Sequence, residues 1–119
     1  MYKRFVVDHV NRQSGVNQGI LGAAYRLSRE EKLNGSAKLE LDSHLEWLED
    51  AFVTPEIFDK PENLKGVCWF KNSQVEIIDC VRTIVPLVEE CGLAVTELTS
   101  ASPGNIIYED EFQIVAIPE

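Results

Sequence analysis

Residues 66–98 have the sequence GVCWFKNSQVEIIDCVRTIVPLVEECGLAVTEL, and this stretch decides the fold class that the chain predicts. Residues 67–70 are apolar on both alternating faces, which is typical of a strand that is covered on both sides. A capping box of Ser73 and Glu76 then opens a helix. Because residues 93–98 have the pattern of another strand, we predict a βαβ unit with parallel pairing and a right-handed crossover.

This capped helix should carry the main face of the core. Its apolar positions recur with helical spacing at Ile77, Val81, Ile84, Val88 and Cys91. Upstream, residues 15–33 have the apolar spacing of one helix, and Ser36 can cap a second. We therefore predict that an antiparallel helical hairpin precedes the βαβ unit.

The C-terminal residues 103–116, PGNIIYEDEFQIVA, predict a β-hairpin with strands at residues 106–108 and 112–117. A further short strand is indicated at residues 2–7. The whole chain, residues 1–119, then forms one α+β domain with a mixed sheet of about four strands. One helix covers one face of this sheet, and the helical hairpin or a second subunit covers part of the other.

The charge of the chain is acidic and uneven, with a formal net charge of −9. Residues 1–38 carry seven basic and three acidic groups, whereas residues 39–119 carry four basic and seventeen acidic groups. An acidic surface repels phosphate backbones, so nucleic-acid binding is not expected. No apolar run approaches the roughly twenty residues that span a bilayer, so we expect a soluble, cytoplasmic protein without membrane contact.

Cysteines and histidines give no sign of a metal site or of catalysis. Cys68, Cys80 and Cys91 form no C-x-x-C pair and lie near no histidine at ligand spacing, so zinc and a disulfide framework do not fit. Two histidines without a spacing signature define no catalytic constellation. We expect no cofactor and no metal, and a protein that binds rather than catalyses.

The predicted hairpin turn contains three consecutive acids, Glu109, Asp110 and Glu111, next to Tyr108. Adjacent carboxylates repel one another, and of the three only Asp110 tolerates the left-handed region that tight turns use. We therefore predict these four residues as a partner-binding site that recognises a basic protein. The competing interpretation is a solvated turn whose charges prevent edge-to-edge aggregation.

A second candidate site lies at the start of the first predicted helix, where polar residues cluster. Asp8, His9, Arg12 and Ser14 would surround a helix N-terminus, which presents unpaired N–H groups to an anion. Trp69 is a candidate for lining the same ligand pocket. Capping and solvation explain the polar residues equally well, and packing explains the tryptophan.

Gly15, Gly19 and Ala23 are four residues apart on the first predicted helix. Interior glycines destabilise a helix by about 1 kcal/mol each relative to alanine, so a close backbone contact should compensate. The contact is either with the second helix or with another subunit. Together with the doubly apolar strand, this pattern predicts a homodimer.

From residue 55 onward the chain resembles a widespread family of small bacterial proteins with no established activity. The resemblance rests on Trp69-Phe70, on Glu89 to Gly92 and, most specifically, on a C-terminal motif of the form P-G-x-I-x-Y-E-D-E-x-Q-x-V-A. Asn105 and Pro86 depart from that pattern. The resemblance implies no substrate, cofactor or partner.

These observations favour a small binding or regulatory module that acts through protein–protein contacts. Two alternatives remain: a small-molecule pocket protein or enzyme with its site at the start of the first helix, and an acidic protein that neutralises a basic toxin. The pocket alternative predicts that Asp8, His9 or Arg12 lies beside Tyr108 or Trp69. The docking alternative predicts an exposed acidic turn.

Overall fold

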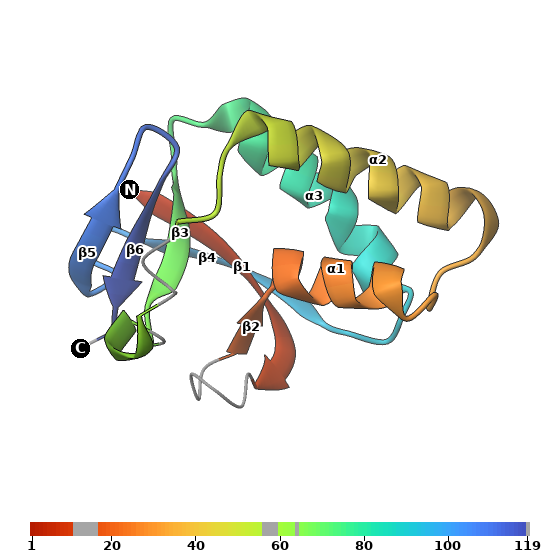
Figure 1. Cartoon of the computed structure of the whole chain (residues 1–119), viewed down its shortest axis with the longest axis horizontal. Helices are drawn as coiled ribbons and strands as arrows, with labels where there is room; N and C mark the ends of the chain where they lie inside the picture. The colour runs from red at the N-terminus through yellow and green to blue at the C-terminus, as the bar shows by residue number, and fades with distance from the viewer. Residues whose placement is uncertain (11–16, 56–59, 64, 119) are drawn as a thin grey trace.

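The computed structural model describes residues 1–10, 17–55, 60–63 and 65–118. These residues form an α+β structure (Figure 1). In chain order its elements are β1 (Tyr2–Val10), β2 (Asn17–Gly19), α1 (Ile20–Arg29), α2 (Gly35–Ala51), the short 3-10 helix η2 (Pro61–Asn63), β3 (Val67–Lys71), α3 (Val75–Glu89), β4 (Val95–Ser100), β5 (Asn105–Glu109) and β6 (Gln113–Ile117).

Strand β1 lies at the centre of the described sheet, because three other strands pair with it. All three pairs are antiparallel. Strand β4 pairs along one edge of β1 from Tyr2 to Val7. Strand β3 pairs with β1 at Tyr2 and Lys3, whereas β2 pairs with it from Val6 onward. Since a strand has only two edges, β2 and β3 follow one another along the edge opposite β4. The sheet continues from β3 through β6 to β5.

The predicted arrangement of an N-terminal helical hairpin, a βαβ unit and a four-stranded mixed sheet is wrong. Two strands precede the helices, and the described residues contain a six-stranded sheet. The strands expected to be parallel neighbours, β3 and β4, lie on opposite edges of β1 instead. Both strands therefore pair with β1, a segment some seventy to a hundred residues before them in the chain. No local sequence pattern identifies a partner at that distance.

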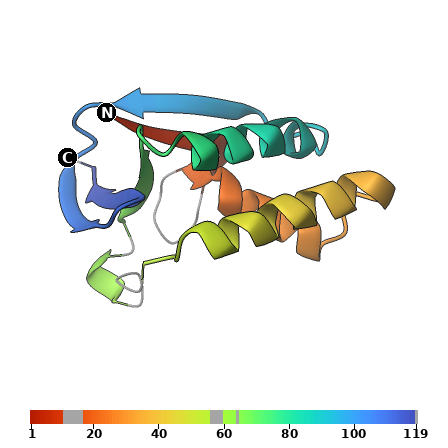
Figure 2. The same ribbon diagram turned by 90° about the horizontal axis from the view of Figure 1, so that it is seen from above.

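The helices lie on one side of the long β1–β4 pair, and β3, β6 and β5 extend beyond them (Figures 1 and 2). The space between sheet and helices is filled by one apolar cluster that includes Phe5 and Val7 of β1. Four positions of the stripe predicted for α3 are confirmed, since Ile77, Val81, Ile84 and Val88 are all buried in this cluster, whereas Cys91 lies beyond the end of the helix and is only partly buried. The leucine stripe of α2 is buried there as well.

Two helix starts differ from the sequence-based prediction. Ser73 does not cap α3: the N-cap residue is Gln74, without a side-chain cap bond, because residues 71–74 form a turn in which the Gln74 N–H donates to the carbonyl of Lys71 at 3.0 Å. Helix α1 begins only at Ile20, because the preceding residues are extended and pair with β1.

Two glycines contact the backbone of another segment, and one of these contacts, at Gly104, is too close for a Cβ. Gly104 precedes β5 with φ of 132°, and a Cβ there would collide with the backbone oxygen of Ile117. Gly19 lies against the carbonyl oxygen of Phe5, and Ala23 is fully buried in the core. These two members of the predicted small-residue face therefore make contacts within the chain, whereas Gly15 lies outside the described residues.

None of the helices in the described parts of the chain combines the length and hydrophobicity that a membrane crossing requires.

Candidate functional site

A cavity opens where β3 leaves the edge of β1. The last β1 residue paired with β3 is Lys3 and the first paired with β2 is Val6, so Arg4 and Phe5 border the gap between the two neighbouring strands. The start of α1 and the chain that follows α2 surround this gap. Together they line a cavity that is open to solvent on one side and has a volume of about 880 Å³.

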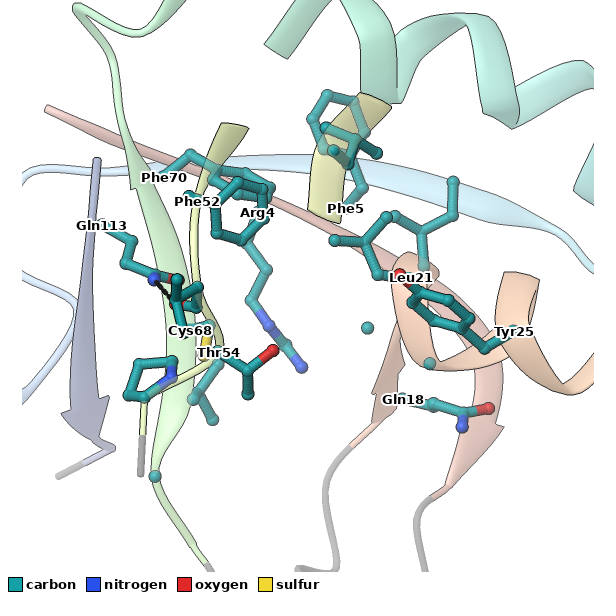
Figure 3. Close-up of a pocket in the computed structure, with 18 of the residues that line it drawn as sticks. Arg4, Phe5, Gln18, Leu21, Tyr25, Phe52, Thr54, Cys68, Phe70 and Gln113 are labelled. Atoms are coloured by element: carbon teal, nitrogen blue, oxygen red, sulfur yellow. Dashed lines mark hydrogen bonds between the residues drawn. The ribbon is translucent and has the colours of Figure 1, made fainter. Parts of the chain in front are cut away.

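The walls of the cavity are mainly apolar (Figure 3). Aromatic rings and aliphatic side chains come from β1, α1, β3 and the segment after α2, among them Phe5, Leu21, Tyr25, Phe52, Val67 and Phe70. Phe52 and Phe70 meet edge to face, with ring centroids 5.4 Å apart, which fixes both rings at the boundary between cavity and core. Such walls suit the apolar part of a ligand.

Arg4 is the basic residue among the described lining residues. Its side chain is half-buried, and the guanidinium Nη2 donates a hydrogen bond to the backbone oxygen of Asn17 at 2.8 Å. Within the described residues no carboxylate lies within ion-pair distance of it. Burial lowers the pKa of Arg4, although an arginine in a protein keeps its charge. The cavity thus contains a positive charge without a negative partner from the described chain.

Gln18 supplies a second polar group to the cavity wall. Its side chain lies against α1 at Gly22, where a Cβ would approach Gln18 Nε2 to 3.1 Å. The Gln18 Oε1 atom is buried and has no hydrogen-bond partner among the described residues. A buried amide oxygen without a partner is costly, so this atom is a candidate acceptor for a donor group on a ligand.

Tyr25 and Glu49 join α1 to α2 at the cavity. The Tyr25 hydroxyl donates to Glu49 Oε1 at 2.8 Å. Burial, together with this hydrogen bond and the charge of Glu49, raises the pKa of Tyr25 to about 12. The tyrosine is therefore a neutral donor at physiological pH, and Glu49 is the acidic residue among the described lining residues.

Cys68 also lines the cavity but does not have the properties of a nucleophile. Burial raises the pKa of the Cys68 thiol to about 11, although the neighbouring charge of Arg4 acts in the opposite direction. Because the thiolate is the reactive form, this cysteine is a neutral apolar surface at pH 7. His9 and His44 do not belong to the described lining of the cavity.

The ligand-binding residues predicted from the sequence do not form this cavity. Asp8 and His9 are exposed near the end of β1, and Arg12 and Ser14 lie outside the described residues. Trp69 is half-buried, but it alternates along β3 with Cys68 and Phe70, which do line the cavity. The start of the first helix does border a pocket, as the alternative interpretation expected, but through Gln18 to Tyr25.

Sequence reasoning missed Arg4 because a single cation within a strand is ordinary on a solvated face. The signal that could have identified it is that Arg4 directly precedes the apolar run Phe5 to Val7, whose buried side chains show that both faces of the strand are covered there. The fold alone shows that this cation points into a cavity and lacks a carboxylate among the described residues.

The acidic turn between β5 and β6 is built around Asp110. Its Oδ1 accepts hydrogen bonds from the backbone N–H groups of Phe112 at 2.8 Å and Gln113 at 3.0 Å. Its Oδ2 accepts the Tyr108 hydroxyl at 2.8 Å and the Gln113 side chain at 3.3 Å. Burial would raise the pKa of Asp110, but these donors hold it below its ordinary value. Asp110 therefore does serve the geometry of the turn.

The two glutamates of the turn differ from each other. Glu109 forms an ion pair with Lys71 at the end of β3, at 2.6 Å. Glu111 is exposed, and its carbonyl oxygen accepts a hydrogen bond from Gln74 Nε2 at 3.3 Å. Two of the three acids thus have partners inside the molecule, and the assignment of Tyr108, Glu109, Asp110 and Glu111 to a partner remains a prediction.

The described residues contain no group of three or more histidine, cysteine, aspartate or glutamate side chains arranged to hold a metal ion. The cavity beside β1 is consequently defined by its shape, its apolar walls and the charge of Arg4. The family resemblance stays a prediction. No family model, curated protein or solved structure matches this chain.

Proposed function

We propose that this chain is a small-molecule-binding protein and that its ligand occupies the cavity between β2, α1 and β3. The observation that carries the proposal is a cavity of about 880 Å³ with mainly apolar walls. Ligand pockets in proteins typically have volumes of roughly 300–1,000 Å³ and the same kind of lining.

The location of the cavity also supports binding. Six elements, β1, β2, α1, α2, β3 and β6, contribute described residues to its lining, and polar groups such as those of Arg4 and Gln18 stand among apolar side chains. This combination of an apolar container with a few polar groups is how proteins orient a bound molecule. The three cysteines are free thiols, which supports a reducing compartment such as the cytoplasm as the site of action.

The direct test uses the neutral apolar dye N-phenyl-1-naphthylamine, whose fluorescence rises in an apolar pocket. We expect saturable binding of one dye per chain. Leu21→Trp places a large side chain into the cavity from α1 and should weaken dye binding about tenfold or more. The control is Leu39→Trp, because Leu39 is 73% exposed on α2 and is not part of the described cavity lining.

Two results would reject this function. One is the absence of saturable binding to the wild-type chain, and the other is equal binding by Leu21→Trp and wild type. Circular dichroism of both variants establishes that the fold is retained before the affinities are compared.

A second candidate function, recognition of a basic protein, is favoured by the surface next to the acidic turn. Trp47 of α2 and Val75 of α3 are 44% and 60% exposed. With Phe112 they line a shallow depression close to the exposed Glu111. An aromatic surface beside negative charge suits a basic segment with an apolar anchor, as in the toxin-neutraliser interpretation.

The predicted homodimer belongs to this second candidate, because exposed apolar side chains such as Trp47 could equally serve a second copy of the chain. Light scattering at micromolar concentration measures the mass directly. We expect a dimer, and Trp47→Lys should shift the population toward monomer. A monomer mass for the unmodified protein would reject the dimer.

A further inference from the structure

Besides its apolar walls, the cavity has a further property, which is the charge of Arg4. Three cations lie on the described strands of the sheet, and two of them have carboxylate partners: Lys3 pairs with Glu97 at 3.1 Å and Lys71 with Glu109 at 2.6 Å. Arg4 is bonded instead to the backbone oxygen of Asn17. In a chain with 20 acidic and 11 basic groups, a half-buried cation without a described carboxylate is conspicuous.

A guanidinium has five N–H donors, and its described hydrogen bond to Asn17 uses one of them. Figure 3 shows the Arg4 side chain extending into the space between β3 and β2, with Gln18 and Tyr25 across from it. Removing a charge from water without pairing it is unfavourable, and a bound anion would reverse that cost. The planar fork of an arginine matches an anion with two adjacent oxygens, such as a carboxylate, through two parallel hydrogen bonds.

The positive end of a helix lies at the same place. Helix α1 starts at the cavity, its N-cap is Gly19 without a side-chain bond, and no acidic residue stands in its first turn. The partial positive charge of that end adds to the potential that Arg4 creates. Burial also lowers the pKa of Arg4, as expected for a cation that is partly removed from water without a carboxylate among the described residues beside it.

The charges around the cavity favour an anion with one negative charge over one with two. Among the described lining residues one cation, Arg4, stands against one acid, Glu49, and the chain as a whole has a net charge of −9. A phosphate with two negative charges would therefore be opposed by the surroundings. A carboxylate is neutralised by one guanidinium.

The rest of the ligand must be mainly apolar. Beyond Arg4, most of the described lining consists of the rings of Phe5, Phe52, Phe70 and Tyr25 and of aliphatic side chains, with polar groups such as that of Gln18 among them. Each methylene group buried against such walls strengthens binding about fourfold. The hydroxyl of Tyr25 is already bonded to Glu49 and leaves the ring as an apolar surface.

Resting on the proposed function, we infer that the ligand is an apolar monocarboxylic acid whose carboxylate pairs with the guanidinium of Arg4 and whose body fills the cavity toward α1. The unpaired amide oxygen of Gln18 would accept a hydrogen bond from a donor group on that body. The chain then discriminates against neutral molecules of the same shape, through the cost of leaving Arg4 unpaired.

The experiment measures displacement of N-phenyl-1-naphthylamine by three probes with the same chain length: decanoate, decanol and decyl phosphate. We expect decanoate to displace the dye from the wild type more effectively than decyl phosphate does. In Arg4→Gln the affinity for decanoate should fall about tenfold while that for decanol is unchanged. Arg29→Gln removes the same charge from an exposed position on α1 and should change neither affinity.

The outcomes separate this inference from the proposed function. If the dye binds but decanoate affinity is the same in Arg4→Gln and wild type, or decyl phosphate binds more tightly than decanoate, the monocarboxylate is rejected and the cavity still binds small molecules. If the dye does not bind at all, the proposed function fails first. Arg4→Lys keeps the charge and loses the planar guanidinium, so a partial loss of decanoate affinity in this variant would support recognition through two parallel hydrogen bonds. An Arg4→Gln protein that still binds the dye excludes misfolding as the cause of its lost decanoate affinity.

Discussion

The turn between β5 and β6 and the cavity beside β1 differ in whether their charged side chains have partners within the described chain. In the turn, the carboxylate of Asp110 accepts hydrogen bonds from Phe112, Gln113 and Tyr108, and Glu109 has Lys71 as its counter-charge. In the cavity, the guanidinium of Arg4 has no described carboxylate partner. A charge that is satisfied within the chain stabilises the fold, whereas a charge that is left unpaired is available to a ligand.

The residues that stand out in the sequence are not the ones that lack a partner in the folded chain. Three adjacent acids attract attention, yet the structure accounts for two of them through bonds within the chain. A single arginine in a strand attracts none, yet it is directed into a cavity. Local density of charge is thus a weaker guide to function than the presence or absence of a partner in the folded chain.

The comparison predicts first that Asp110 is needed for stability. Asp110→Ala removes the acceptor of two backbone N–H groups and of the Tyr108 hydroxyl, so the free energy of unfolding should fall by about 3 kcal/mol. Urea denaturation followed by circular dichroism measures this loss. Glu111→Ala is the matched control and should change stability by less than about 0.5 kcal/mol. Equal losses in the two variants would show that the turn is not held by Asp110.

A smaller effect is expected at the rim of the cavity. Tyr25→Phe removes the hydrogen bond to Glu49 and should lower the free energy of unfolding by about 1 kcal/mol. The pKa of Tyr25 is raised from 10.0 to about 12 in the folded chain, so the protonated form is favoured by folding. Its contribution is complete below pH 10 and is lost as the pH rises through the folded value near 12.

The pH dependence is measured as the stability difference between the wild type and Tyr25→Phe. This difference should stay constant up to about pH 10 and shrink above it. A difference that grows with pH in that range would have the wrong sign for a tyrosine whose neutral form is the bound one.

A surface charge network provides an intermediate case. Glu97 on β4 accepts hydrogen bonds from Arg82 of α3 and from Lys3 of β1, and these partners hold the pKa of Glu97 below its ordinary value. The carboxylate remains 36% exposed, so screening by water limits its contribution. Glu97→Gln should cost about 0.5 kcal/mol in low salt and less in high salt. A cost of several kcal/mol, or one that is insensitive to salt, would contradict this.

The smallest effect on stability is expected at Arg4. Arg4→Met removes a half-buried charge that has no carboxylate partner among the described residues and keeps the unbranched apolar stem, so the free energy of unfolding should change by less than about 0.5 kcal/mol while decanoate affinity falls. Calorimetry with and without decanoate measures both quantities. A destabilisation as large as that of Asp110→Ala would show that Arg4 has a structural role and would remove the contrast between the two regions.

Several elements were predictable because their signals are local. The α3 stripe of Ile77, Val81, Ile84 and Val88 is buried as expected, since a period near four residues places these side chains on one face regardless of what covers it. The β5–β6 hairpin also follows from neighbouring residues, because its two strands pair with each other across a short turn. The cap of α3 was not predictable in the same way, because the turn at residues 71–74 moves Ser73 out of the cap position.

By itself, the sequence determined most of the helical and extended segments and the buried stripe of α3, because burial periodicity and turn residues act over a few positions, although it placed the strand at residues 17–19 within a helix. Only the tertiary structure decided that β1 separates β3 from β4, and that β3 and β2 share one edge of β1 with a gap between them. Strand partners are chosen by contacts between residues far apart in the chain, and the cavity at Arg4 is a product of that choice. For this reason no local pattern in the sequence identified the candidate site, because its lining residues come together only when the strands pair.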